Sequence, residues 1–129
     1  PSLGLLTINA LVAADKLLIP IQCEFYALEG VTKLLDSMNR VKKMLNPSLD
    51  IFGIVMTMYD SRTNLSNQVV ENVKENLDAK IYETMIPRNI RLAEAPSYGL
   101  PINMYDSKSA GAESYRKLAK EIINRKDLD

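Results

Sequence analysis

The stretch LDIFGIVMTMY, residues 49–59, constrains the fold of this chain more than any other segment. Apolar and β-branched residues follow one another there instead of alternating with polar ones. That pattern is typical of a strand that is covered on both faces, and such strands belong to parallel sheets flanked by helices. We therefore predict that residues 49–59 form the central strand of an α/β sheet.

The rest of the chain alternates between helix and strand patterns. Two more strands are predicted at KLLIPIQCE (16–24) and KIYETMIP (80–87), and Pro20 removes a ladder donor, which favours an edge strand or a bulge. Apolar residues recurring at three and four positions predict helices at residues 2–14, 27–45, 65–79 and 109–126. The order predicts an α/β fold, part of a mostly parallel doubly wound sheet.

Four local features refine this prediction. The first helix is apolar around so much of its circumference that we expect both of its sides to be packed. Asn46 and Pro47 end the second helix. Residues 89–102 are predicted to be a structured loop with one helical turn before Pro96. In the last helix we expect four inward side chains, Tyr115, Leu118, Ile122 and Ile123.

Composition narrows the class of protein. The 129 residues are 47% hydrophobic, enough for one domain with a core, and Lys plus Arg equals Asp plus Glu at 16 each. DNA binding would therefore need a local basic patch. The absence of His and the single Cys23 exclude Ser-His-Asp catalysis and an internal disulfide. With no apolar run near the ~18 residues of a membrane span, we expect a cytoplasmic protein.

Three polar loops follow the predicted strands. They are QCEFYALEG (22–30), TMYDSRTNLSNQV (57–69) and IPRNIRLAEAPSYG (86–99). Ligands of parallel sheets bind beyond the carboxyl ends of the strands, so these loops are the expected site. Taken in this order, the three segments resemble the C-terminal half of ParA/Soj-type chromosome or plasmid partition ATPases, which are relatives of MinD among the deviant Walker P-loop ATPases. The resemblance runs from Pro1 to about Ile122.

The resemblance implies that residues 1–129 are the C-terminal portion of a single ParA-type ATPase domain. The Walker B aspartate and the phosphate loop would lie before Pro1, and no GxxxxGK[ST] pattern occurs in this chain. ATP and Mg²⁺ are then cofactors of the intact protein. We expect the chain alone neither to bind them tightly nor to hydrolyse ATP.

Residues 87–89 are the first candidate site. Pro87 fixes the backbone, Arg88 offers a planar cation and Asn89 a paired donor and acceptor, which suits a purine edge; solvated side chains at a strand exit are the plain alternative. The resemblance assigns this loop to the adenine and ribose pocket, with Met58 on the opposite wall. Glu24 is either a possible accessory residue that orients water or contacts a partner subunit, or a helix-start carboxylate without function.

The closing helix carries the second candidate site. Glu113, Lys117, Glu121 and Arg125 are spaced by four and predict a solvated ladder of alternating charge. Arg116 and Lys120 have the same spacing with no acid between them, which suits contact with phosphates. The other basic candidates for this patch are Arg91, Lys74 and Lys108. Glu94 could form an ion pair with Arg91. Such a patch would bind DNA through its backbone, independently of sequence and with strong salt dependence.

By resemblance, the intact protein dimerises on ATP, binds DNA non-specifically on the bacterial or archaeal nucleoid, and is stimulated by a ParB-like partner. Two alternatives remain. A MinD-like division-site regulator would need a basic, apolar C-terminal tip, whereas this chain ends NRKDLD, so no membrane partner is expected. A non-enzymatic fragment would bury its exposed sheet edge by self-association.

Overall fold

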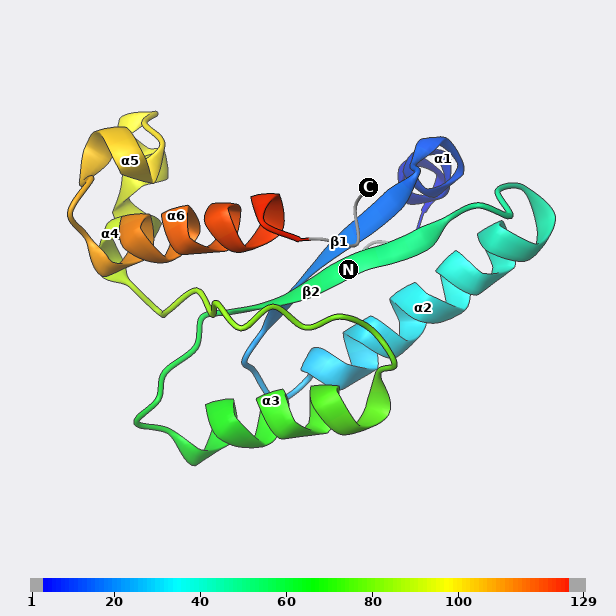
Figure 1. Cartoon of the computed structure of the whole chain (residues 1–129), viewed down its shortest axis with the longest axis horizontal. Coiled ribbons are helices and arrows are strands. Elements are labelled where there is room, and N and C mark those ends of the chain that lie inside the picture. Colours follow the sequence, from blue (N-terminus) through cyan, green and yellow to red (C-terminus); the bar gives the residue numbers. More distant parts are fainter. Residues whose placement is uncertain (1–3, 126–129) are drawn as a thin grey trace.

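The computed structural model describes residues 4–125, and Figure 1 shows the arrangement of its elements. Strands β1 (Lys16–Gln22) and β2 (Asp50–Thr57) pair in parallel, with a register shift between Leu17 and Leu18. Residues 80–88 follow the other side of β2 through backbone hydrogen bonds. The predictions of a parallel α/β sheet and of a central strand at residues 49–59 are confirmed, and β1 is an edge strand within the described residues.

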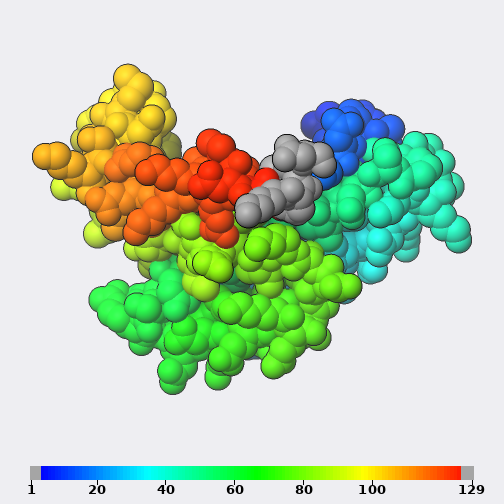
Figure 2. Space-filling model, in the orientation of Figure 1, coloured from blue at the N-terminus to red at the C-terminus, as the bar shows by residue number. Residues whose placement is uncertain are grey.

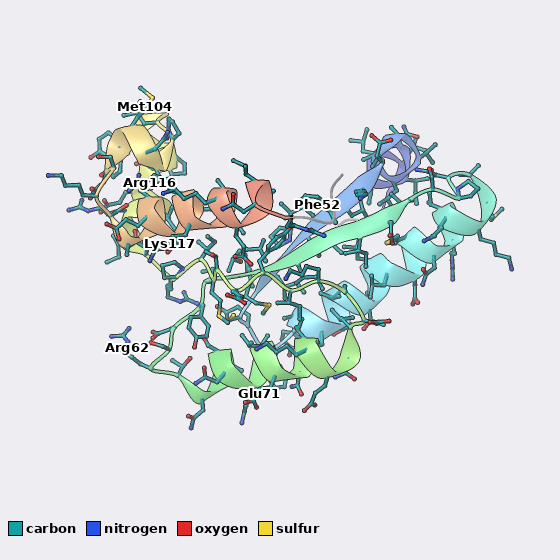
Figure 3. All side chains as sticks on the ribbon, viewed as in Figure 1. Phe52, Arg62, Glu71, Met104, Arg116 and Lys117 are labelled. Atoms are coloured by element: carbon teal, nitrogen blue, oxygen red, sulfur yellow. The ribbon has the colours of Figure 1, made fainter. Side chains whose placement is uncertain are left out.

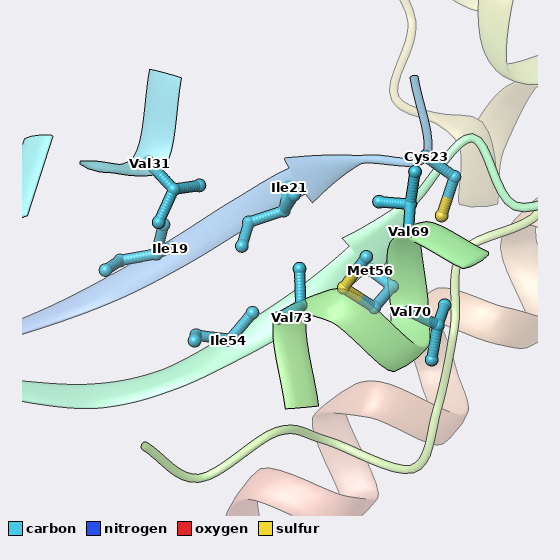
Figure 4. Packing of buried hydrophobic residues seen from close by; sticks show 9 residues of the cluster. All are labelled: Ile19, Ile21, Cys23, Val31, Ile54, Met56, Val69, Val70 and Val73. Carbon is cyan, nitrogen blue, oxygen red and sulfur yellow. The ribbon is translucent and has the colours of Figure 1, made fainter. Parts of the chain in front are cut away.

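Helices cover both faces of β2. On one face lie α2 (Ala27–Met44) and α3 (Asn64–Asn76), which pack on a core that Figure 4 shows from close by. On the other face lies α6 (Ala110–Ile123), whose Leu118 packs with Val55, Tyr82 and Ile86. Figure 2 shows α6, in orange and red, across the side of the molecule opposite the green α3. The core between the two strands, α2 and α3 consists of Ile19, Ile21, Cys23, Val31, Ile54, Met56, Val69, Val70 and Val73.

Between residues 80–88 and α6 the chain makes three short helical turns. These are α4 (Ile90–Glu94), the 3-10 turn η1 (Ala95–Tyr98) and α5 (Ile102–Tyr105). The segment is more helical than the single turn predicted there. None of the described helices is both long and apolar enough to cross a membrane.

The predicted strand at residues 80–87 is instead two isolated parallel bridges, Ile54 with Ile81 and Tyr59 with Pro87. Its pairing with β2 is interrupted, because Tyr82 N–H donates to Ile54 O at 2.9 Å and Ile86 N–H to Met56 O at 2.9 Å. The two acceptors on β2 are two residues apart, whereas the two donors are four residues apart, so the segment has two extra residues between them. Residues 83–85 form a bulge, which hydrophobic periodicity does not reveal.

Helix α1 (Leu5–Ala13) corrects the expectation that both sides of the first helix are packed. Its predicted start at Ser2 lies outside the described residues. Leu11 is buried against α2 and Leu49, whereas Leu5 and Leu6 are 77% and 83% exposed. The reason is that α2 covers only one side of α1 within the described part of the chain.

Asn46 ties the end of α1 to the loop after α2. Its Nδ2 donates to the carbonyl oxygens of Leu11, Val12 and Ala14 at 3.1, 3.1 and 2.8 Å. Because the last carbonyls of a helix have no partner within it, this amide serves as a C-terminal cap. The sequence indicated Asn46 only as the end of the second helix.

We expect Asn46→Ala to lower the free energy of unfolding by about 1–2 kcal/mol, because the side chain is half-buried and three carbonyls lose their donor. Urea unfolding followed by circular dichroism measures the loss. Asn39→Ala is the matched control, since Asn39 is exposed on α2 and alanine favours a helix. Equal stability of the two variants would contradict the capping role.

Two expectations for the last helix are wrong. Leu118 is buried and Ile122 half-buried as predicted, but Tyr115 and Ile123 are 46% and 77% exposed. The predicted charge ladder is also not uniformly solvated. Glu121 accepts hydrogen bonds from the bulge at residues 83–85, and Arg125 donates to the hydroxyl of Tyr82 at 2.7 Å. The interrupted strand provides polar partners that helical spacing alone cannot show.

Candidate functional site

A cavity of about 580 Å³ opens at the carboxyl ends of the strands. All four residues predicted to bind nucleotide, Met58, Pro87, Arg88 and Asn89, line it. Its volume lies within the range of about 300–1,000 Å³ typical of small-molecule sites. The rest of the lining consists of Pro20, Thr57, Ile86, Ile90, Leu92, Ala93 and Tyr115. Five of these seven residues lie in the two loops expected to form the site, residues 57–69 and 86–99, whereas the sequence did not indicate Pro20 and Tyr115.

The backbone joins two walls of this cavity. Tyr59 N–H donates to Ile86 O at 3.0 Å, and Arg88 N–H donates to Tyr59 O at 3.0 Å. Met58 lies between the end of β2 and Tyr59. Its φ of 51° is in the left-handed region that non-glycine residues rarely adopt. Such strained positions occur where surrounding structure holds them, and here the cross-loop hydrogen bonds do so.

Arg88 is held from the other side by Glu24. Its Nη2 donates to Glu24 Oε1, which joins the loop after β1 to the loop after the bulge. The side chains of Arg88 and Glu24 are 53% and 45% exposed, so this ion pair is open to solvent at the carboxyl ends of the strands. Sequence reasoning selected both residues but did not pair them, because they are far apart in the sequence.

Asn89 has a structural task besides its predicted one. Its side chain accepts a hydrogen bond from Leu92 N–H at 3.3 Å and caps the N-terminus of α4. Asparagine immediately before a helical turn is the signal that would have predicted this cap. Tyr115 gave no comparable signal, since which loop a helix face reaches depends on the tertiary arrangement.

Asp60 and Arg62, in the loop after β2, pair with each other. Arg62 donates to both carboxylate oxygens of Asp60, at 2.9 and 2.8 Å. These bonds, with the Arg62 backbone N–H and the charge of Arg88, lower the pKa of Asp60 to about 2. Burial, followed by the charge of Glu24, raises the pKa of the Cys23 thiol, so this group is protonated at neutral pH.

The structure divides the predicted basic patch. Arg116 and Lys120 are exposed on α6, and Arg116 donates to Ser107 O at 2.6 Å, next to exposed Lys108. Lys74 lies on α3, on the opposite face of the sheet. Figure 3 shows this separation through its labelled neighbours, Arg116 and Lys117 on α6 and Glu71 on α3.

Arg91 lies between two acids. It pairs with Glu94 at 3.0 Å, as the spacing predicted, and with Asp106 at 3.4 Å. Tyr105 O–H also donates to Glu94 at 2.9 Å. The positive charge of Arg91 is therefore offset locally, and Arg116, Lys120 and Lys108 form the less compensated group, which we call the α6 basic surface. Among residues 4–125, no cluster of three His, Cys, Asp or Glu side chains is placed to hold a metal ion.

Comparison with known proteins gives consistent matches. A family model described as an AAA domain matches residues 1–51. The chain is 52% identical to chromosome partitioning protein ParA of Caulobacter vibrioides over 97% of its length, and 58% identical to sporulation initiation inhibitor protein Soj of Bacillus subtilis over 95%. It is 54% identical to chromosome-partitioning ATPase Soj of Treponema pallidum over 97%. It spans about half of these relatives, at 47, 48 and 49% of their lengths.

A solved structure shares the fold. Cobyrinic acid a,c-diamide synthase from Mycobacterium smegmatis, with bound ADP and magnesium, superposes with a TM-score of 0.74 at 33% identity. The match covers 99% of this chain and 45% of that protein. The likeness extends over the whole α/β arrangement described above.

Proposed function

The chain belongs to the ParA/Soj family of chromosome-partitioning proteins, and we propose that residues 1–129 are the C-terminal portion of the ATPase domain of such a protein. Within it, this chain supplies the wall that binds the adenine and ribose of ATP. The observation that carries the proposal is the convergence of Met58, Pro87, Arg88 and Asn89 on one cavity at the carboxyl end of the sheet.

The chemistry of the cavity fits a nucleoside. Apolar side chains such as Ile90 and Leu92 offer surfaces for a flat ring, and Arg88 and Thr57 offer polar groups at its margin. A purine needs both, since its faces are apolar and its edge carries donors and acceptors. The bound ADP and magnesium of the M. smegmatis synthase support the use of a nucleotide with Mg²⁺ in the intact protein.

The intact protein would act as a switch on DNA. In this proposal ATP joins two subunits, the dimer binds DNA non-specifically on the nucleoid in the cytoplasm, and a ParB-like partner stimulates hydrolysis. The α6 basic surface is our candidate for the contact with DNA phosphates. Lysine and arginine there would neutralise phosphates without reading bases.

The test compares adenosine, which carries no phosphate, with ATP. We expect adenosine and ATP to bind this chain with similar, weak affinity, on the order of 1 mM, because the phosphate-handling motifs are not in its sequence. Heteronuclear NMR titration should place the shifted resonances at residues 57–58 and 86–93. Arg88→Ala should weaken binding about tenfold, as expected for losing a cation–π contact of about 1–2 kcal/mol.

Arg40→Ala is the matched control, because Arg40 is exposed on α2, away from the cavity. It should leave the adenosine affinity unchanged. Equal losses in both variants, or shifts confined to α2 and α3, would rule out the cavity as the base-binding wall.

A further inference from the structure

We infer that Glu121 is a positioning residue for the base-binding wall. Its carboxylate holds the bulge at residues 83–85 and thereby determines where Pro87, Arg88 and Asn89 lie relative to Met58. The inference rests on the proposed function of the cavity, since it names a residue outside the cavity that sets the geometry of one wall.

The first step is the geometry of the segment. It is fixed to β2 before the bulge, where Ile54 N–H donates to Lys80 O at 2.7 Å and Tyr82 N–H donates to Ile54 O. It is fixed again after the bulge, where Ile86 N–H donates to Met56 O and Arg88 N–H to Tyr59 O. The number of residues in the bulge therefore determines which residues lie beside Met58 and form the wall.

The second step is the alternative that the bulge excludes. Regular parallel pairing after Tyr82 would bring Thr84, instead of Ile86, to the position facing Met56. A shift of two residues keeps the same side chains on each face, so alternation alone does not prevent it. It would advance the chain by two residues past Met58 and remove Arg88 from its place beside Glu24.

The third step is how the two backbone amides of the bulge are satisfied. In the bulge, Thr84 N–H does not reach β2 and donates instead to Glu121 Oε2 at 2.9 Å. Glu83 N–H, which points away from β2 even in regular pairing, donates to Glu121 Oε1 at 2.7 Å. Burial raises the pKa of Glu121, but hydrogen bonds from Thr84 and Glu83 and the charge of Lys80 outweigh it, so the pKa is lowered. A charged acceptor with two oxygens is what this bulge requires.

The chain just after α6 also fixes the residue before the bulge. Arg125, one turn after Glu121, donates to the Phe52 carbonyl and to the Tyr82 hydroxyl, and its guanidinium lies 4.6 Å from the centroid of the Phe52 ring. Tyr82 in turn lies against Gly53, where an added Cβ would be only 2.4 Å from the tyrosine ring. The bulge is thus confined between an anchored tyrosine and the carboxylate of Glu121.

The experiment compares the unmodified chain with Glu121→Gln by NMR, first without nucleotide. Glutamine keeps one acceptor and places an NH₂ group against the second amide. We expect hydrogen exchange at Glu83 or Thr84 to accelerate at least tenfold and the amide resonances of Arg88 and Asn89 to move. Titration with adenosine should then give an affinity at least threefold weaker than that of the unmodified chain.

Glu113→Gln is the matched control, an exposed carboxylate on the same helix, and should change neither the exchange rates nor the wall resonances. If exchange accelerates at residues 83–84 while Arg88 and Asn89 stay unmoved, Glu121 supports only the bulge and the inference is overturned. If the wall moves but the unmodified chain binds no adenosine, positioning stands and the proposed function fails. Should Glu121→Gln unfold, protonating Glu121 in the unmodified chain must move the wall resonances together with those of residues 83–84.

Discussion

Tyr82→Ala is expected to lower the free energy of unfolding by about 3–5 kcal/mol, the usual loss for removing a buried aromatic side chain. Tyr82 is 1% exposed and packs with Val55, Ile86 and Leu118 between the sheet and α6. Its hydroxyl accepts from Arg125, so the substitution also leaves a guanidinium with one partner fewer. Urea unfolding followed by circular dichroism measures the loss, and α6 should lose hydrogen-exchange protection first.

Two further substitutions separate packing from hydrogen bonding. Tyr82→Phe keeps the ring against Gly53 and removes only the hydroxyl, so a loss of about 1.5–3 kcal/mol is expected for a hydrogen bond to a charged group. Tyr26→Ala should change stability by less than about 0.5 kcal/mol, because Tyr26 is 73% exposed. A Tyr82→Ala variant as stable as Tyr26→Ala would mean that α6 does not depend on this core.

Fold class followed from the sequence because burial leaves a pattern. The apolar run at residues 49–59 correctly predicted a central parallel strand, and Pro20 correctly predicted an edge or irregular strand. The bulge at residues 83–85 left no such pattern, since its amides are satisfied by Glu121, 37 residues away from Thr84. The exposure of Leu5 was equally unpredictable, because an apolar pattern shows which side chains a helix could bury but not which neighbouring elements are there to cover them.

The candidate site was predictable where one loop carries several functional groups. Pro87, Arg88 and Asn89 follow one another, and the structure places all three at the cavity together with Met58. The pairing of Glu24 with Arg88 was not predictable, since it depends on the order of strands in the sheet. The same reason explains why the position of Lys74 was not predictable. The sequence analysis assigned Lys74 to one patch with the basic residues of α6, but the fold places it on the opposite face of the sheet.

Reversing the charges of the α6 basic surface is expected to have the largest effect on DNA binding in the intact protein. Arg116→Glu combined with Lys120→Glu removes two cations, and within the described residues neither cation forms an ion pair with a carboxylate. If both contact phosphates, affinity for a duplex should fall more than tenfold at low salt. The slope of log K against log salt should become shallower by about 1.8, at about 0.9 per lost contact. Fluorescence anisotropy with unrelated duplex sequences measures both, and the loss should be the same for each.

The fold itself provides the control for this experiment. Lys43→Glu with Lys74→Glu changes the net charge by the same amount but acts on α2 and α3, across the sheet from α6. Since charges beyond roughly 8 Å are screened at physiological ionic strength, this variant should keep its DNA affinity within about twofold. An equal loss in both pairs would mean that net charge alone attracts DNA. Loss only in the control pair would move the DNA surface to α2 and α3, and Lys74 would return as a contact residue.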